Sequence, residues 1–219
     1  AGTYFFRISF TQPVDHNNPA GPTFQQRVTL LHRDEAKPTV LITDGYSTSN
    51  NPTQGELTYY LQSNQVRVEH RFFVSSTPNP ADWSKLDIWQ SASDLHAITQ
   101  SLKGIYTAGW VSTGASKSGM TSTYYRYYFP NDVVATVPYV APSSHGTSDP
   151  RYVTFLGNVG PADCRLALRN FQKAALQKRE AILPLIPDSD GYTVLGKDRA
   201  LEFAVLELPF AFWQYGDQT

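Results

Sequence analysis

Residues 110–121 constrain this chain more than any other part of its sequence. They run Trp-Val-Ser-Thr-Gly-Ala-Ser-Lys-Ser-Gly-Met-Thr, with Ser116 near the middle. The apolar start predicts a buried strand, Gly114 and Gly119 bound a sharp turn, and a helix is expected from about Lys117. A serine at the tip of a strand–turn–helix is typical of a nucleophile elbow, which presents a reactive hydroxyl. We therefore predict that Ser116 is a catalytic nucleophile.

An elbow of this kind needs small residues two positions before and after its serine, because the turn forces that serine into unfavourable backbone angles. Gly114 and Ser118 occupy these positions. Glycine is usual at both, so Ser118 is a small departure from the pattern. Ser118 is also an alternative nucleophile, although its own flanking residues, Ser116 and Met120, suit an elbow poorly. The other alternative is an ordinary strand–helix turn.

The same turn predicts where a developing oxyanion would be held. The amide of Lys117 starts the expected helix and would donate to the oxyanion, where one donor lowers the barrier by about 3 kcal/mol. A second donor should come from the loop after an earlier strand. The loop that begins at Asp44 follows the apolar run 40–43, and the Tyr46 amide is the candidate. The Lys117 side chain is not expected to be the base, because adjacent residues do not face each other.

Strands and helices are predicted to alternate around this turn. The alternation over residues 38–141 predicts a parallel sheet with helices on both faces. We interpret residues 1–142 as α/β, the N-terminal portion of an α/β-hydrolase core. The longest helix is expected to be capped by Asp82 or Ser84 and to end at Gly104. Strands are expected at 4–10, 24–32, 38–44, 65–70, 110–113 and 133–140, and helices at 56–62, 86–106 and 117–129.

The pattern changes after Pro142. Residues 166–183 and 199–208 predict two helices, joined by a loop over 184–191. We interpret residues 143–219 as a helical cap inserted over the sheet, and as an incomplete one. The polar stretch 216–219 suits a protease-sensitive loop.

Histidine offers no obvious base in this sequence. Hydrolases of this fold place the base after the last strand of the sheet, so His70, at a strand end, is interpreted as structural. Its neighbours Glu69 and Arg71 are expected to pair or to hold nearby loops. His96 falls on the polar side of the long predicted helix.

Composition excludes several classes of function. A net charge of -1 gives no electrostatic footprint for nucleic acid, and no run of about 18 apolar residues could span a membrane. No cluster has metal-site spacing and no glycine loop would cradle phosphate, so neither a metal nor a cofactor is expected. The start Ala1-Gly-Thr fits either the end left by removal of a signal peptide or an artificial boundary, and the scarcity of lysine favours a secreted protein. Cys164 is either a free thiol or bridged to a partner chain.

Four short motifs occur in order along the chain. They are Gln12-Pro-Val-Asp-His16, Phe24-Gln-Gln-Arg27, Glu69-His-Arg-Phe-Phe73 and Gly114-Ala-Ser-Lys-Ser-Gly-Met-Thr121. Together they resemble the secreted bacterial prolyl tri- and tetrapeptidyl aminopeptidases and, more distantly, lysosomal prolylcarboxypeptidase and dipeptidyl peptidase. The resemblance covers roughly residues 4–142, and residues 201–213 look like the family's cap. Each motif is weak alone, and the set is specific.

The resemblance implies an α/β-hydrolase with a helical cap and a Ser-Asp-His triad, in which Ser116 matches the nucleophile. The Asp and His are expected from a second chain of an enzyme nicked in its cap, or from the missing part of a truncated one. It also implies release of short peptides from a free N-terminus, often after proline. Glu207, or otherwise Glu202, is a candidate counter-ion for the peptide's α-ammonium, the alternative being a solvated helix charge. Trp213 is a candidate to line a proline pocket.

Two other functions fit the same residues. One is an esterase or lipase on the same fold, and the other is a non-enzymatic, hydrolase-like binding domain that has lost its triad. The motif set and an aromatic cap with acidic residues favour the peptidase.

Overall fold

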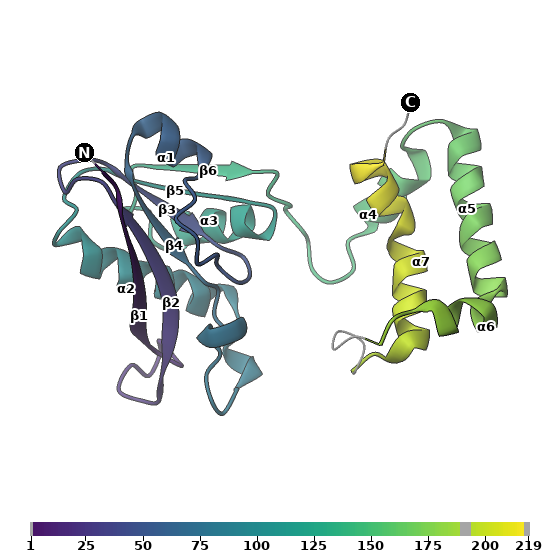
Figure 1. The fold of residues 1–219 in the computed structure, drawn as a ribbon, viewed down its shortest axis with the longest axis horizontal. Coiled ribbons are helices and arrows are strands. Elements are labelled where there is room, and N and C mark those ends of the chain that lie inside the picture. Colours follow the sequence, from purple (N-terminus) through teal and green to yellow (C-terminus); the bar gives the residue numbers. More distant parts are fainter. Residues whose placement is uncertain (1, 189–193, 217–219) are drawn as a thin grey trace. The chain divides into compact units, whose positions relative to one another are not determined.

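The chain forms two compact units in the computed structural model, Ala1–Ser143 and Ser144–Thr219 (Figure 1). The structure describes residues 2–188 and 194–216. Most of the expected polar tail at 216–219 and the end of the expected loop at 184–191 therefore lie outside the described residues. That the second unit covers the sheet as a cap stays a prediction.

The first unit is built on a six-stranded mixed sheet in the order β1-β2-β4-β3-β5-β6. β1 and β2 form an antiparallel hairpin, β2 pairs antiparallel with β4, and the remaining neighbours are parallel. The predicted α/β class with a parallel sheet is confirmed for the part of the sheet that carries Ser116. The strands are β1 Tyr4–Pro13, β2 Thr23–His32, β3 Thr39–Thr43, β4 Asn64–Val68, β5 Trp110–Ala115 and β6 Ala135–Tyr139.

Three α-helices connect the parallel strands: α1 Glu56–Leu61, α2 Ile88–Lys103 and α3 Lys117–Tyr128. The predicted cap of the long helix is wrong. Asp87, whose side chain accepts a hydrogen bond from the Gln90 amide, caps α2. Asp82 instead caps a short 3-10 helix, η2 Trp83–Lys85, which ends before α2 begins. Leu86 and Asp87 separate the two helices, so the cap of α2 is the residue directly before Ile88.

The core lies where α2 and α3 pack against each other and against the strands. The Tyr125 hydroxyl is buried there, where it donates to the Asp132 carboxylate at 2.9 Å and lies within hydrogen-bond distance of the Thr99 hydroxyl at 3.0 Å. Pro138 is tolerated because β6 is the outer strand of the described sheet, so a missing N–H on its open side breaks no ladder. The apolar core comprises Val28, Leu30, Leu41, Val66, Val68, Ala92, Leu95, Ile98, Tyr106, Trp110, Tyr125 and Val133.

A buried ion pair joins α2 to the end of β4. Arg71 and Asp94 are 0% and 1% exposed and form two parallel hydrogen bonds, at 2.8 Å from Nε and 2.7 Å from Nη2. His16 Nε2 contacts the same carboxylate at 2.8 Å. Gln12 links to the Asp94 carbonyl and to Gln26 at 2.9 Å each. Residues from three of the four sequence motifs therefore contact one residue of α2, Asp94, directly or through Gln12.

The second unit is helical, with α4 Pro150–Asn158, α5 Ala162–Gln177, α6 Arg179–Ile182, a 3-10 turn η3 Leu183–Leu185, and α7 Gly196–Tyr215. No helix was expected at α4, although Asp149 and Pro150 are a typical N-cap and first helical residue. α5 and α7 pack against each other, with Leu201 and Val205 buried. Cys164 lies on α5, half-buried and free.

The predicted end of the last helix at residue 208 is wrong, because α7 continues through Pro209. A proline inside a helix removes one N–H and leaves the carbonyl four residues earlier without its partner. That carbonyl belongs to Val205, and Gln172 of α5 donates to it from Nε2 at 2.6 Å. A side chain from another helix thus satisfies the group that Pro209 leaves open.

We expect Asp94→Ala to lower the free energy of unfolding by about 3–5 kcal/mol, because Arg71 would stay buried without its anion. Asp188→Ala is the matched control, since Asp188 also pairs with a cation but its side chain is 93% exposed. The control should cost about 0–1 kcal/mol. Urea unfolding of the three proteins measures both values, and equal small losses would contradict the role given to this pair.

Candidate active site

The turn between β5 and α3 has the geometry of a nucleophile elbow. β5 ends at Ala115 and α3 begins at Lys117, so Ser116 alone makes the turn. Its φ of 57° and ψ of -126° lie in a region that L-residues rarely adopt. The Ser116 amide donates to the Tyr139 carbonyl of β6 at 3.0 Å, which helps to hold the strained residue in place. Ser116 itself is exposed.

Close packing explains the small residues around Ser116. A Cβ on Gly114 would lie 2.6 Å from the Ser118 carbonyl group, and one on Gly119 would lie 2.9 Å from Ala141 and from the Tyr139 oxygen. Neither position can accept a side chain without moving backbone. Ser118 fits because its hydroxyl turns away from the elbow tip and donates to the Thr43 carbonyl. Because its hydroxyl proton is used in this hydrogen bond, Ser118 is a poor alternative nucleophile.

The first turn of α3 also contacts the loop after β3. Thr43 Oγ1 donates to the Ser118 carbonyl at 2.8 Å, which returns the bond that Ser118 makes to Thr43. A Cβ on Gly45 would lie 2.7 Å from the Ser118 nitrogen, so the loop backbone sits directly on the start of the helix. The structure thus brings together the two segments whose amides, at Lys117 and Tyr46, were predicted to bind an oxyanion.

The Lys117 side chain turns toward the same loop. Its Nζ donates to the Gly45 carbonyl. It lies 4.8 Å from the centre of the Tyr46 ring and 4.7 Å from that of Phe73, both within cation–π range. Partial burial lowers the pKa of the Lys117 ammonium. Sequence reasoning missed these contacts, since nothing in the sequence places Phe73 beside residue 117.

A buried carboxylate holds the far end of this loop. Glu69 is fully buried, and its Oε2 accepts from the Thr48 amide at 3.1 Å and from Arg27. Its Oε1 accepts from Ser75 and Ser76 at 3.0 and 2.8 Å. Glu69 pairs with Arg27 rather than with Arg71, so the expected Glu69–Arg71 pair does not form. The alternative expectation, that both residues hold nearby loops, describes them correctly.

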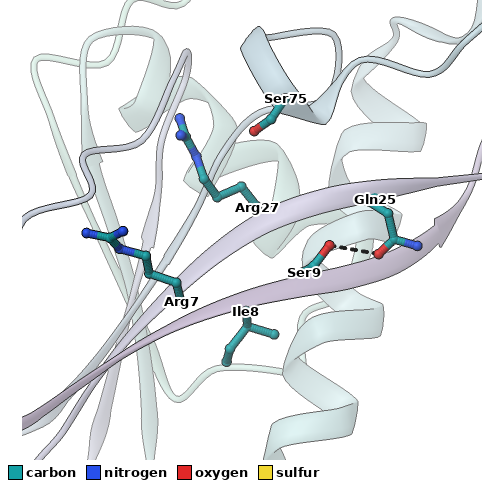
Figure 2. A pocket seen from close by; sticks show the side chains of 6 residues that line it. All are labelled: Arg7, Ile8, Ser9, Gln25, Arg27 and Ser75. Atoms are coloured by element: carbon teal, nitrogen blue, oxygen red, sulfur yellow. Dashed lines mark hydrogen bonds between the residues drawn. The ribbon is translucent and has the colours of Figure 1, made fainter.

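Two arginines on the hairpin strands hold the loop from outside. Arg27 donates to the Thr48 carbonyl at 3.1 Å, and Arg7 to the Asn50 carbonyl at 3.4 Å. Both line a pocket of about 280 Å³ over β1 and β2. Figure 2 shows the side chains that line it. The pocket has no lining residue from the elbow, so it is separate from the Ser116 turn.

His70 is packed as a structural residue. Its ring is buried, contacting the Arg71 carbonyl from Nδ1 at 2.9 Å and Ser91 from Nε2 at 3.1 Å. Burial, with the nearby Lys117 ammonium adding to it, lowers the pKa of His70 to about 4. His96 stacks on Phe129 and contacts Asp132. Among the described residues, no histidine ring contacts Ser116.

Three further candidates lie on α7 of the second unit. The Glu202 carboxylate accepts hydrogen bonds from Arg179 and Arg199 at 2.9 and 2.7 Å, and these bonds lower its pKa. Glu207 is exposed and has no partner among the described residues. Trp213 packs on Gly160 and lines a pocket of about 200 Å³. The other lining residues are Leu156, Gly157, Arg165, Leu168, Arg169, Gln172 and Pro209.

Residues 2–188 and 194–216 contain neither a metal-site cluster nor a membrane-spanning helix. No group of three or more His, Cys, Asp and Glu residues there could hold a metal ion. No helix in that part of the chain has the length and hydropathy needed to cross a bilayer.

Comparison with known proteins gives matches by sequence and by fold. The sequence model of the family described as PS-10 peptidase S37 matches residues 1–219. A prolyl tri/tetrapeptidyl aminopeptidase from Streptomyces mobaraensis is 46% identical over 225 residues, which cover 100% of this chain and 47% of that protein. The chain therefore spans about half the length of this curated relative.

Solved structures are similar at the level of the fold. A prolyl endopeptidase structure matches with a TM-score of 0.50 and 15% identity, over 64% of this chain and 21% of that one. A peroxisomal α/β-hydrolase, Lpx1 from Saccharomyces cerevisiae, matches with a TM-score of 0.43 and 13% identity, over 72% of this chain and 56% of that one. The mixed sheet, the elbow at Ser116 and the match to the prolyl endopeptidase structure confirm the predicted α/β-hydrolase core.

We expect the free energy of unfolding to fall in acid because the buried His70 ring resists protonation. Above pH 6.5 the ring is neutral in both folded and unfolded chains, so it has no effect. Between pH 6.5 and 4 the unfolded chain takes up a proton that the folded chain does not, because the folded pKa is about 4. The loss should reach about 3 kcal/mol by pH 4.

Denaturant unfolding at a series of pH values measures this loss. His70→Gln should flatten the decline between pH 6.5 and 4, whereas His145→Gln, at an exposed position, should keep the wild-type slope. A wild-type slope in the His70 variant would show that other groups cause the decline.

Proposed function

The chain belongs to the PS-10 peptidase S37 family, and we propose that it carries the nucleophile and oxyanion hole of a serine exopeptidase. The observation that carries this proposal is the exposed Ser116 at φ 57° between β5 and α3. A serine held there is costly in backbone energy and is available to substrate, which suits a nucleophile and not a structural residue.

The substrate we propose is a peptide with a free N-terminus, from which a tri- or tetrapeptide is released, preferably after proline. The name of the Streptomyces relative supports this class, at 46% identity across the whole chain. An esterase or lipase, or a non-enzymatic binding domain, has no such relative to support it here. We also propose that the protein is secreted.

In the proposed reaction Ser116 Oγ attacks the carbonyl carbon of the scissile bond and gives its proton to a histidine. The carbonyl oxygen becomes an oxyanion, which the Lys117 and Tyr46 amides receive. The tetrahedral intermediate then breaks, the leaving amine takes the proton, and water releases the acyl group from Ser116. Since the relative is about twice as long, we propose that the Asp and His come from a further segment or a second chain.

A fluorophosphonate should label the whole enzyme once, at Ser116, as mapped by intact and peptide mass spectrometry. Ser116→Ala should abolish labelling and lower kcat by about 10⁵- to 10⁶-fold. Ser118→Ala is the matched control in the same turn, and it should still be labelled at Ser116. An adduct on Ser118, or labelling that survives Ser116→Ala, would count against this assignment.

Recognition of the α-ammonium gives a second test. A tripeptide amide with a free N-terminus should be hydrolysed, and its N-acetylated form should not. Glu207→Gln should raise KM about tenfold or more, because a charged hydrogen bond contributes about 1.5–3 kcal/mol. Glu202→Gln should leave KM near the wild-type value, since two arginines already occupy that carboxylate. The reverse ranking would move the role to Glu202.

A further inference from the structure

The Lys117 ammonium lies beside the loop after β3, which begins at Asp44 and carries the Tyr46 amide; we refer to it as the oxyanion loop. The Lys117 backbone itself starts α3, directly after Ser116. Its Nζ donates to the Gly45 carbonyl, and the Tyr46 and Phe73 rings flank it. The two rings lie edge to face with their centres 5.4 Å apart. A flexible lysine side chain is thereby held in one place by three contacts.

The carbonyl that Lys117 holds belongs to a particular peptide group. The Gly45 oxygen and the Tyr46 N–H are parts of the same planar trans peptide and point in opposite directions. A donor that fixes the oxygen therefore fixes the direction of the N–H as well. None of the described residues accepts a hydrogen bond from the Tyr46 N–H. It is a free donor in a packed loop.

The next peptide group is fixed from the other side. The Tyr46 carbonyl accepts a hydrogen bond from the His70 amide at 3.0 Å, at the end of β4. Gly45 meanwhile sits against the start of α3, where a Cβ would lie 2.9 Å from the Lys117 carbonyl carbon. The loop is thus held at three points, and the Lys117 ammonium is the one that acts directly on the peptide carrying the Tyr46 N–H.

We propose that the Lys117 ammonium is a positioning residue for the oxyanion hole, which it orients by holding the Gly45–Tyr46 peptide. The inference rests on the proposed peptidase function and adds to it a role for the lysine side chain. Without this contact the Gly45 carbonyl loses its hydrogen bond, and the Gly45–Tyr46 peptide can tilt within the loop, which the other two contacts still hold. The Tyr46 N–H then no longer meets the oxyanion, whereas ground-state binding of the peptide is unaffected.

Steady-state kinetics of Lys117→Met in the whole enzyme test this role. The methionine keeps the length and apolar contacts of the side chain and removes the ammonium. We expect kcat to fall about 10- to 100-fold with KM changed by less than about threefold, because an oxyanion exists only in the transition state. The affinity for a peptide aldehyde, whose adduct with Ser116 occupies the oxyanion hole, should fall in proportion to kcat.

The matched control is Lys37→Met, an exposed lysine elsewhere on the same unit, which should leave both constants unchanged. Unchanged kcat in the Lys117 variant, or a rise in KM alone, overturns the inference. If that variant does not fold, Phe73→Leu removes one flanking ring and should lower kcat about threefold. An unchanged kcat there also overturns it. An inactive wild type would instead overturn the proposed function on which the inference rests.

Discussion

The Arg71 guanidinium is completely buried, and the packing of the segments around the end of β4 depends on how its charge is neutralised. Asp94 supplies the anion from α2, while Arg71 Nη1 also donates to the carbonyls of Val14 and Lys85 at 3.0 Å each. One side chain therefore fixes the end of β1, the segment before α2 and α2 itself against β4. A buried charge tolerates few alternative arrangements, because any arrangement that leaves it unpaired is heavily penalised.

Three consecutive residues, Glu69, His70 and Arg71, connect this buried ion pair to the loop after β3. Arg71 fixes the chain after β4, the His70 amide holds the Tyr46 carbonyl, and Glu69 holds the Thr48 amide. Each of the three holds a different point, so the loop after β3 inherits the rigidity of the buried network. Preorganised donors need this rigidity, because a donor that must reorient during the reaction loses much of its effect.

Elements that depend only on neighbouring residues could be predicted from the sequence. The strands, α3 and the turn at Ser116 follow from apolar runs and glycine spacing. The structural role of His70 follows from the expectation that hydrolases of this fold place the base after the last strand of the sheet. Contacts made across the fold were not predicted. Asp94 lies 23 residues from Arg71, and Gln172 lies 33 residues from the Val205 carbonyl that it satisfies. Pro209 alone predicts a helix end, and only the distant glutamine makes the longer helix possible.

Ser118 shows how a departure from a motif can be structural. Glycine at this position would satisfy the steric demand of the elbow and keep the carbonyl that accepts from Thr43, but it would lose the hydroxyl bond to the Thr43 carbonyl. The serine and Thr43 exchange hydrogen bonds, so β3 and the first turn of α3 are joined at the point where the oxyanion loop begins. Gly114 must remain glycine in either case, because a Cβ there would lie 2.6 Å from the backbone carbonyl group of residue 118 and would also overlap the Ser118 hydroxyl oxygen. The two positions of the motif are therefore in direct contact: the backbone of residue 118 excludes a side chain at 114, while the serine side chain at 118 adds a bond to β3.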